Sequence, residues 1–372
     1  MASKARQLAQ SASAPEGRKN ILINGAKEVF QRSTSASAVT TDIYSAPDRW
    51  KTRVGDTSEF TISQSSTAPD GFVNSTKWDC TTANTSLSSG SFIIYEQRIE
   101  AQDLQHLQYG TSSAKAITVS FHVRSNKTGV YTVGLFANDG NRQIESSYTI
   151  NSADTFEKKT ITFPGDTGGT INDDNGEGLR VWFWLGGGTN FSSGTQATSW
   201  AAYDATQVLA DNQVNLADST SNEWYITGVQ LEVGSVATEF EHQKYCDVYK
   251  DCQRYYYKSG DNADSGNEWF PGVATHSGKG VYYAISGSGI NDRAYPALQW
   301  PVQMRTAPSI TFYPGRSDTT NTEDRITIYN GSGAVTFSTS PTPYSNGLSY
   351  HFQGTSTDAI FYSYQIVADA EI

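Results

Sequence analysis

Charge, sulfur and long apolar runs are scarce in this chain of 372 residues. Charged residues make up 17% of it, and it has 3 Cys and 2 Met. Such low charge excludes long solvated helices and coiled coils. No run of about 18 apolar residues occurs, so no segment is expected to span a bilayer. Because the number of cysteines is odd, a disulfide framework is not expected, and we predict that Cys80, Cys246 and Cys252 are thiols.

The charge that is present is mostly negative. The formal net charge is −11 and the sequence pI is about 4.9. Nucleic acid and anionic membrane surfaces are therefore not expected as partners. The N-terminal residues lack the apolar stretch and cleavage pattern of a secretory signal, so we expect synthesis in a cytoplasm and no secretion by the usual route.

Aromatic residues are abundant, at 12% of the chain. Together with many Ser, Thr, Gly and Val residues they favour pleated strands and tight turns, which predicts an all-β protein. From Asn20 to about Phe240 the pattern is short strands separated by polar turns. The expected strands cover residues 21–23, 91–100, 117–125, 130–138, 155–163, 179–187 and 223–232. The short turn at 126–129 predicts a hairpin between its two flanking strands. Such a series fits a two-sheet sandwich of jelly-roll type.

An amphipathic helix is predicted over residues 241–257, because apolar residues from Tyr245 to Tyr256 recur at helical spacing. It precedes a polar linker and a second, smaller β-rich domain, with strands expected near 281–286, 309–313, 325–329 and 360–369. The predicted organisation is therefore an N-terminal arm (1–18), a jelly roll (19–240), the connecting helix (241–257) and a C-terminal β domain (258–372).

Several landmarks in this order resemble a family of bacteriophage tail fibre and virion structural proteins with a carbohydrate-binding-module-like jelly roll. The opening and closing landmarks are Asn20–Gly25, Val29–Arg32, Asp48–Trp50, Val229–Gly234, Ala237–Glu241 and Cys252–Tyr256. The C-terminal domain adds Trp300–Pro308 and Ala368–Ile372. One departure is Glu239, which stands where the family often has proline.

The resemblance implies a phage virion structural protein, a tail fibre or tail-tip subunit that attaches the particle to the host surface by binding a glycan receptor. It also implies a homotrimer on the virion exterior (tail or capsid), made in the host cytoplasm, with residues 1–18 docked into another virion protein. The alternatives are a capsid fibre or decoration protein, and a bacterial carbohydrate-binding or depolymerising accessory protein.

Catalytic motifs are not found. The five His residues lack zinc-site spacing, and nucleophile-elbow, P-loop and dinucleotide-binding patterns do not occur. We therefore expect adhesion without enzymatic activity. No cofactor is expected, apart from a structural calcium that the resemblance implies. Asp173, Asp174 and Glu177 in one acidic loop offer the oxygen ligands that calcium prefers, as do Asp261 and Asp264 in another, although such loops also form ordinary solvated turns.

Aromatic residues provide the candidate ligand contacts, because rings suit both sugar stacking and core packing. Trp182 and Trp184 share one face of a strand whose other face is also apolar. In the C-terminal domain a second set is expected near loops at its tip, formed by Trp269, Phe270, Tyr282, Tyr283 and Tyr295. We expect this second set to contact the host surface.

Overall fold

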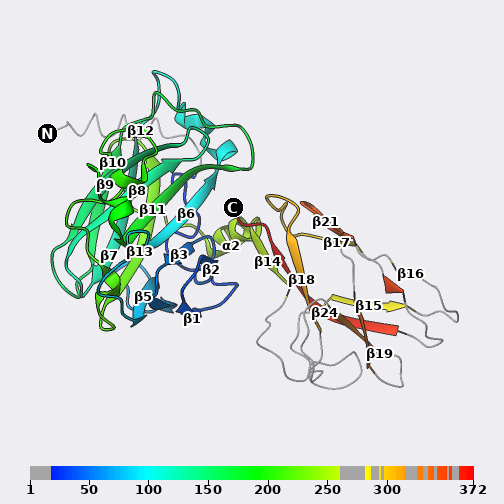
Figure 1. The fold of residues 1–372 in the computed structure, drawn as a ribbon. Coiled ribbons are helices and arrows are strands. Elements are labelled where there is room, and N and C mark those ends of the chain that lie inside the picture. The colour runs from blue at the N-terminus through cyan, green and yellow to red at the C-terminus, as the bar shows by residue number, and fades with distance from the viewer. Residues whose placement is uncertain are drawn as a thin grey trace. The chain divides into compact units, whose positions relative to one another are not determined.

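The fold was analysed in a computed structural model, which describes residues 18–259, 281–285, 293–294, 297–314, 325–329, 334–338, 342–349, 352–353 and 360–372. The chain forms two compact units (Figure 1). The first comprises residues 1–248 with Ile372, and the second comprises residues 249–371. The predicted attachment arm lies outside the described residues except for Arg18, so it stays a prediction.

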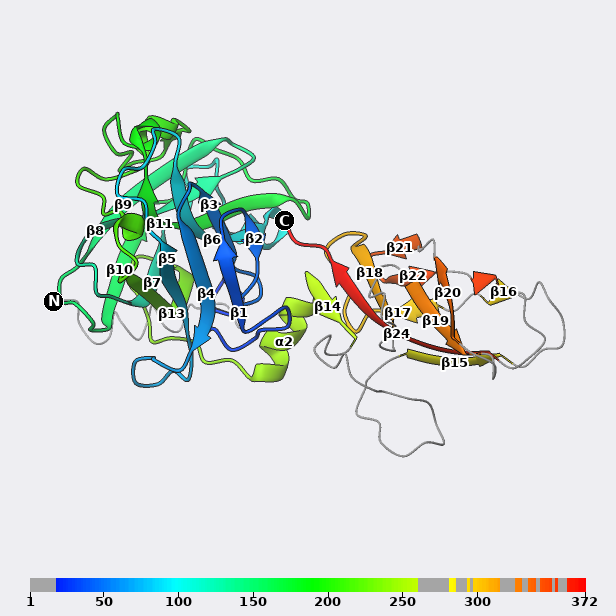
Figure 2. The ribbon, with the colours of Figure 1, turned by 60° about the horizontal axis from the view of Figure 1, so that its bottom comes forward.

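The first unit is an all-antiparallel sandwich of two sheets, as the sequence predicts. The six-stranded sheet has the order β1-β4-β5-β13-β7-β10, and Figure 2 shows β4, β5 and β13 side by side. Its strands are β1 Ser35–Val39, β4 Glu59–Ser65, β5 Ser75–Thr82, β13 Glu223–Val233, β7 Ile117–Ser125 and β10 Glu157–Phe163. The seven-stranded sheet has the order β12-β9-β8-β11-β6-β3-β2. Its strands are β12 Ala201–Ala202, β9 Arg142–Ile150, β8 Gly129–Ala137, β11 Glu177–Gly187, β6 Phe92–Glu100, β3 Lys51–Gly55 and β2 Ile43–Tyr44. Short 3-10 helices lie in the connections: η1 Ala101–Leu107, η2 Thr189–Phe191, η3 Ala205–Gln207 and η4 Leu216–Asp218.

Aromatic side chains from both sheets meet in the core. Phe121 of β7 contacts Phe183 of β11 edge to face, with 5.0 Å between ring centroids. Tyr95 of β6 lies at the centre, stacked on Trp50 at 4.9 Å and edge-on to Trp78 at 5.8 Å. All five side chains are buried. Such pairs stabilise the core beyond the burial of their area. The three cysteines are free thiols, as predicted.

The predicted hairpin at residues 126–129 is wrong. β7 pairs with β13 and β10, whereas β8 pairs with β9 and β11 in the other sheet. The connection is short, but its polar groups bond across to the start of β13: the side chain of Asn126 donates to Ser221 and accepts from the backbone of Glu223. These hydrogen bonds hold the connection in place where the chain passes from one sheet to the other. The short length of a connection alone does not distinguish such a crossing from a hairpin.

The opening landmark is also not a strand. Residues 22–24 form bends, and Ile21 before them donates its N–H to Leu231 of β13 without belonging to a strand. Asn24, the last of them, holds this segment in place. Its side chain donates to the carbonyls of Val29 and Asp48 and accepts from the backbone N–H groups of Glu28 and Val29. The landmark residues around Asn24 and Asp48 therefore form one buried hydrogen-bond network.

Side chains of the closing landmark accept hydrogen bonds from backbone N–H groups of the residues that follow it. The side chain of Gln230 accepts from the N–H of Glu241, and the carboxylate of Glu232 accepts from the N–H and hydroxyl of Thr238. Gly234, at φ +124°, makes the turn between them, a conformation that other residues rarely adopt. Both landmarks thus have a structural explanation in the first unit.

The second unit is β-rich, and the helix before it is shorter than predicted. α2 spans Tyr245–Gln253, and Tyr256 and Tyr257, expected at the helix end, belong to strand β14. The N–H of Ala370 donates to the carbonyl of Tyr255, so pairing with the C-terminal strand ends the helix there. Other strands are β14 Tyr256–Lys258, β15 Val281–Ile285, β16 Arg293–Ala294, β17 Ala297–Gln299, β18 Ser309–Pro314, β19 Arg325–Tyr329, β20 Ala334–Ser338, β21 Thr342–Tyr344, β22 Gly347–Ser349, β23 Phe352–Gln353 and β24 Ile360–Asp369. In the main sheet of this unit, β24 pairs with β14, β15, β18 and β19. No helix among the described residues is long and apolar enough to cross a membrane.

Candidate functional site

The outer face of the seven-stranded sheet carries an unusual row of side chains. Directly paired residues share a face of a sheet, so the register fixes which side chains are neighbours. One row runs from Glu96 on β6 through Trp182 on β11 and Gly134 on β8 to Glu145 on β9. The rows beside it contain Arg98, Arg180, Phe136 and Gln143 on one side, and Arg53, Ile94, Trp184 and Thr132 on the other.

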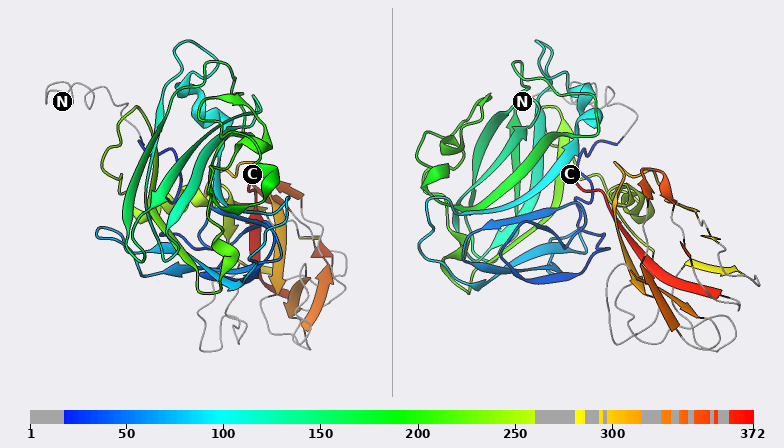
Figure 3. Two further views of the ribbon diagram at one scale, coloured as in Figure 1. Left: turned by 60° about the vertical axis from the view of Figure 1, so that its left-hand side comes forward. Right: turned by 45° about the vertical axis from the view of Figure 1, so that its right-hand side comes forward.

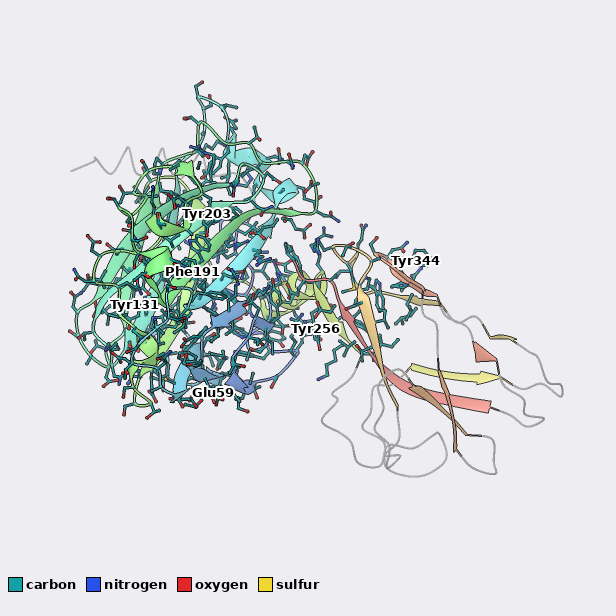
Figure 4. The ribbon with its side chains drawn as sticks, viewed as in Figure 1. Glu59, Tyr131, Phe191, Tyr203, Tyr256 and Tyr344 are labelled. Atoms are coloured by element: carbon teal, nitrogen blue, oxygen red, sulfur yellow. The ribbon has the colours of Figure 1, made fainter. Side chains whose placement is uncertain are left out.

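One half of this face is covered by the segment that follows β11. Trp182 and Trp184 lie on the face opposite Phe183, as the alternation predicts, but they are 3% and 1% exposed. They pack with Ile94, Val208 and Leu209 into a small apolar cluster, flanked by the half-buried rings of Phe92, Phe136, Phe191 and Tyr203. Phe191 and Tyr203 belong to the covering segment and are labelled in Figure 4, and Figure 3 shows this green segment outside the sheet. The two tryptophans are therefore core residues of a second cluster.

A buried carboxyl group supports this cluster. Both oxygens of Glu145 accept from the indole Nε1 of Trp182, at 3.2 and 3.1 Å. Glu145 is 1% exposed, and this burial raises the pKa of its carboxyl group well above the usual range. A Cβ atom on Gly134 would lie 1.6 Å from the Glu145 carboxylate, so the close approach of the three residues requires glycine.

The other half of the face is polar and partly open. Glu96 is fully buried, and its Oε1 accepts from Nε of Arg98 at 2.9 Å. Arg180 donates from Nε to Glu177 at 2.7 Å, and Arg98 forms a second ion pair with Glu177 at 3.3 Å. The side chains of Arg53, Arg98 and Arg180 remain 22%, 16% and 12% exposed.

Two of these arginines lie against aromatic rings. The guanidinium carbon of Arg180 is 4.9 Å from the ring centroid of Phe136, and that of Arg53 is 5.2 Å from the centroid of Phe92. Cation–π contacts of this kind hold a long side chain in one orientation. The result is a set of fixed hydrogen-bond donors beside half-buried aromatic edges, which we call the arginine face, formed by Arg53, Phe92, Glu96, Arg98, Phe136 and Arg180.

The sequence did not identify the arginine face. Its two charged residues on β6, Glu96 and Arg98, stand two positions apart, and charged residues at every second position are typical of any half-solvated strand. Only the register brings them beside Arg53 and Arg180, from strands far apart in the chain. Among the predicted contacts of the second unit, Tyr282 and Tyr283 lie on β15, whereas Trp269, Phe270 and Tyr295 lie outside the described residues.

In the acidic loop predicted to hold calcium, the carboxyl groups of Asp174 and Glu177 have partners within the protein. Glu177 is drawn into the ion pairs with Arg180 and Arg98, while Asp174 accepts from the N–H of Gly176 and closes a turn. Asp173 is exposed. No group of three or more His, Cys, Asp or Glu side chains suited to a metal occurs in the part of the chain that the structure describes, and Asp261 and Asp264 lie outside it.

No protein-family model matches the chain, and no curated protein sequence is similar to it. Among solved structures it is similar to a putative sugar binding protein from Bacteroides thetaiotaomicron, with 11% identity over 58% of this chain and 100% of that one and a TM-score of 0.32. A family 11 carbohydrate-binding module from Clostridium thermocellum gives 12% identity, 55% and 98% coverage and a TM-score of 0.29. The enzymatically active domain of a bacteriophage CBA120 tailspike protein gives 11% identity and a TM-score of 0.31 over 58% of this chain, and the match spans 21% of the tailspike domain. Because these TM-scores are below 0.5, no function, ligand or assembly follows from them.

Proposed function

We propose that this protein is a bacteriophage virion structural protein, a tail fibre or tail-tip subunit, that attaches the particle to a host-surface glycan through the arginine face of its first unit. The observation that carries the proposal is the combination of half-buried aromatic edges with fixed, partly exposed guanidinium groups. Sugars present apolar C–H faces and many hydroxyl groups, and this combination suits both. The phage assignment is supported by the ordered sequence landmarks.

Binding without catalysis is part of this proposal. The carboxyl groups of Glu96, in the arginine face, and of Glu177 beside it are held in ion pairs with arginines, an arrangement that suits recognition better than proton transfer. A single sugar contact of this kind is weak. Assembly as a trimer would present three copies together, and simultaneous engagement raises avidity by roughly 10²–10⁴.

The direct test is binding of the full-length protein to a glycan array and to polysaccharides extracted from candidate host cells. Phe136→Ala removes a ring from the arginine face, and Phe156→Ala is the matched control, because Phe156 is also half-buried but packs against Tyr225 of the other sheet. We expect saturable glycan binding that Phe136→Ala weakens about tenfold or more and Phe156→Ala leaves intact. An array without any bound glycan would refute glycan attachment.

The oligomeric state separates the fibre assignment from its alternatives. Light scattering is measured on the full-length protein and on a chain lacking residues 1–18. We expect trimers of about three times 40.6 kDa in both cases, with the arm free to dock into the particle. Monomers in both cases would contradict the fibre assignment and favour a decoration subunit or a lone carbohydrate-binding module. Depolymerisation of host polysaccharide by the purified protein would favour an enzyme.

A further inference from the structure

A small pocket opens in the first unit where the two sequence landmarks meet. Its lining residues come from two segments, 20–28 and 240–248, and all of them belong to the first unit. The pocket has an empty volume of about 300 Å³, its open mouth included. This volume is at the lower end of the range for ligand pockets, so the pocket suits one small group rather than a stretch of polymer.

Two half-buried carboxylates line this pocket. The side chain of Glu28 makes no hydrogen bond or ion pair with any residue that the structure describes. Oε2 of Glu241 accepts from the backbone N–H groups of Lys19 and Asn20, at 2.9 and 2.8 Å, whereas its Oε1 has no donor among the described residues. Like charges repel more strongly in a partly desolvated pocket than in water, so this pair of carboxylates favours a positively charged occupant.

Two aromatic rings belong to the lining of the same pocket. The rings of Phe240 and His242 meet edge to face, with 5.0 Å between their centroids. Both rings also pack on Phe72, at 5.0 and 5.3 Å, and Phe72 in turn contacts His122 of β7 at 5.3 Å. These contacts hold the rings in place before any ligand binds, which lowers the entropy cost of binding.

The chemistry of the lining favours an organic cation over a metal ion. Calcium takes about six to eight oxygen ligands, and the acidic and His side chains of this pocket do not form a group suited to a metal in the described part of the chain. A primary ammonium group has three N–H donors and needs few acceptors. Aromatic rings also attract organic cations. An ammonium group therefore matches the carboxylates and the rings together.

We propose that this pocket binds the primary ammonium group of an amino sugar, with Glu28 and Oε1 of Glu241 accepting its N–H groups and Phe240 providing an aromatic surface. The site is separate from the arginine face, because the two share no residue. The choice of a sugar as the bearer of the amine rests on the proposed attachment to a host glycan. N-acetylation removes the positive charge, so the acetylated form of the same sugar loses its attraction to both carboxylates.

Isothermal titration calorimetry of the full-length protein tests this inference with three ligands: the glucosamine trisaccharide, the N-acetylglucosamine trisaccharide and Nα-acetyl-lysine amide. We expect the glucosamine trisaccharide to bind about tenfold or more tightly than its acetylated form, and more weakly as salt screens the charges. Equal affinity for the two trisaccharides, or no binding of the glucosamine form, would overturn the ammonium site. Tighter binding of the lysine derivative would overturn the assignment to a sugar and favour a lysine side chain of a partner protein.

Variants assign the binding to the pocket. Glu28→Gln removes one charge at the same size, and we expect an affinity for the glucosamine trisaccharide about tenfold or more below that of wild type. The matched control is Glu59→Gln on β4, since Glu59 is also half-buried but does not line the pocket; it is labelled in Figure 4. Phe240→Leu keeps an apolar side chain without a ring and should weaken binding about threefold to tenfold.

The outcomes separate this site from the proposed function. Unchanged affinity in Glu28→Gln, or an equal loss in Glu59→Gln, would refute the pocket as the amine site. Glycans that bind on the array and depend on Phe136, without binding of the glucosamine trisaccharide, would refute the pocket and leave the proposed function standing. Amine binding that Glu28→Gln weakens, together with glycan binding that Phe136→Ala leaves intact, would support the pocket and refute the arginine face.

Discussion

The ammonium group of Lys27 lies 3.0 Å from the ring centroid of Trp50 inside the sandwich core. Lys27 is fully buried, its Nζ has no hydrogen-bond acceptor among the described residues, and Tyr95 is the next ring, at 5.0 Å. Burial lowers the pKa of Lys27 well below the usual 10.5. Lys27, which lies between two of the sequence landmarks, thus places an ionisable group where an apolar side chain would fit.

We expect Lys27→Met to stabilise the protein by about 1–3 kcal/mol at neutral pH, because desolvation of an ammonium group outweighs a cation–π contact of about 2 kcal/mol. The unfolded chain binds a proton that folded Lys27 resists, so wild-type stability should rise with pH up to about 10.5, and the variant should lose that slope. Chemical denaturation at several pH values measures both effects. Lys27→Ala should be less stable than Lys27→Met by about 2–5 kcal/mol because it leaves a cavity. A destabilised methionine variant would mean that the cation–π contact dominates.

Asn24 is the second test of the buried landmarks. It adopts φ +56° and makes four side-chain hydrogen bonds to backbone groups. Asn24→Ala should cost about 2–4 kcal/mol in free energy of unfolding, since it leaves buried groups unpaired and strains the backbone. Asn24→Gly tolerates the positive φ and should recover about 1 kcal/mol of this loss. A loss below about 1 kcal/mol for Asn24→Ala would show that the fold does not depend on the hydrogen-bond network of Asn24.

How far the sequence alone leads can be judged from these residues. Local patterns predicted β6, β7, β10, β11 and β13, because alternating apolar residues on each strand report directly on burial. Sheet membership was not predictable at residues 126–129, since it depends on bonds from Asn126 to residues about a hundred positions away. The same limit hid the arginine face: Glu96, Arg53 and Arg180 are ordinary polar residues of three strands until the register aligns them. The sequence predicted that Trp182 and Trp184 of β11 share one face of the strand. It did not predict that the segment after β11 covers them, because that segment has no periodic pattern.

Glu145 predicts a pH effect of the opposite sign to that of Lys27. Burial raises its pKa in the folded state, whereas the unfolded chain releases the proton near pH 4.5. The carboxyl group therefore makes the folded protein less stable as pH rises above about 4.5, by about 1.4 kcal/mol for each pKa unit of elevation. Glu145→Gln should gain stability relative to wild type between pH 4 and pH 8, as measured by thermal unfolding. Stability curves of wild type and Glu145→Gln that run parallel over this pH range would contradict the prediction.

Gly134 tests whether the covered half of the face supports the arginine face. A Cβ atom at this position would lie 1.6 Å from the Glu145 carboxylate and 2.6 Å from Nε1 of Trp182. Gly134→Ala must therefore displace a buried carboxyl group and an indole in a close-packed cluster, and we expect a loss of about 2–4 kcal/mol together with a changed tryptophan fluorescence spectrum. Gly90→Ala is the control, because its nearest neighbour would be at 3.8 Å, an ordinary contact.

If Gly134→Ala keeps wild-type stability but loses glycan binding, the tryptophan cluster positions the arginine face, since Arg180 also lies 5.5 Å from the centroid of the Trp182 ring. Wild-type stability with wild-type binding would show that the cluster relaxes without cost, which the close approach of Glu145, Gly134 and Trp182 argues against.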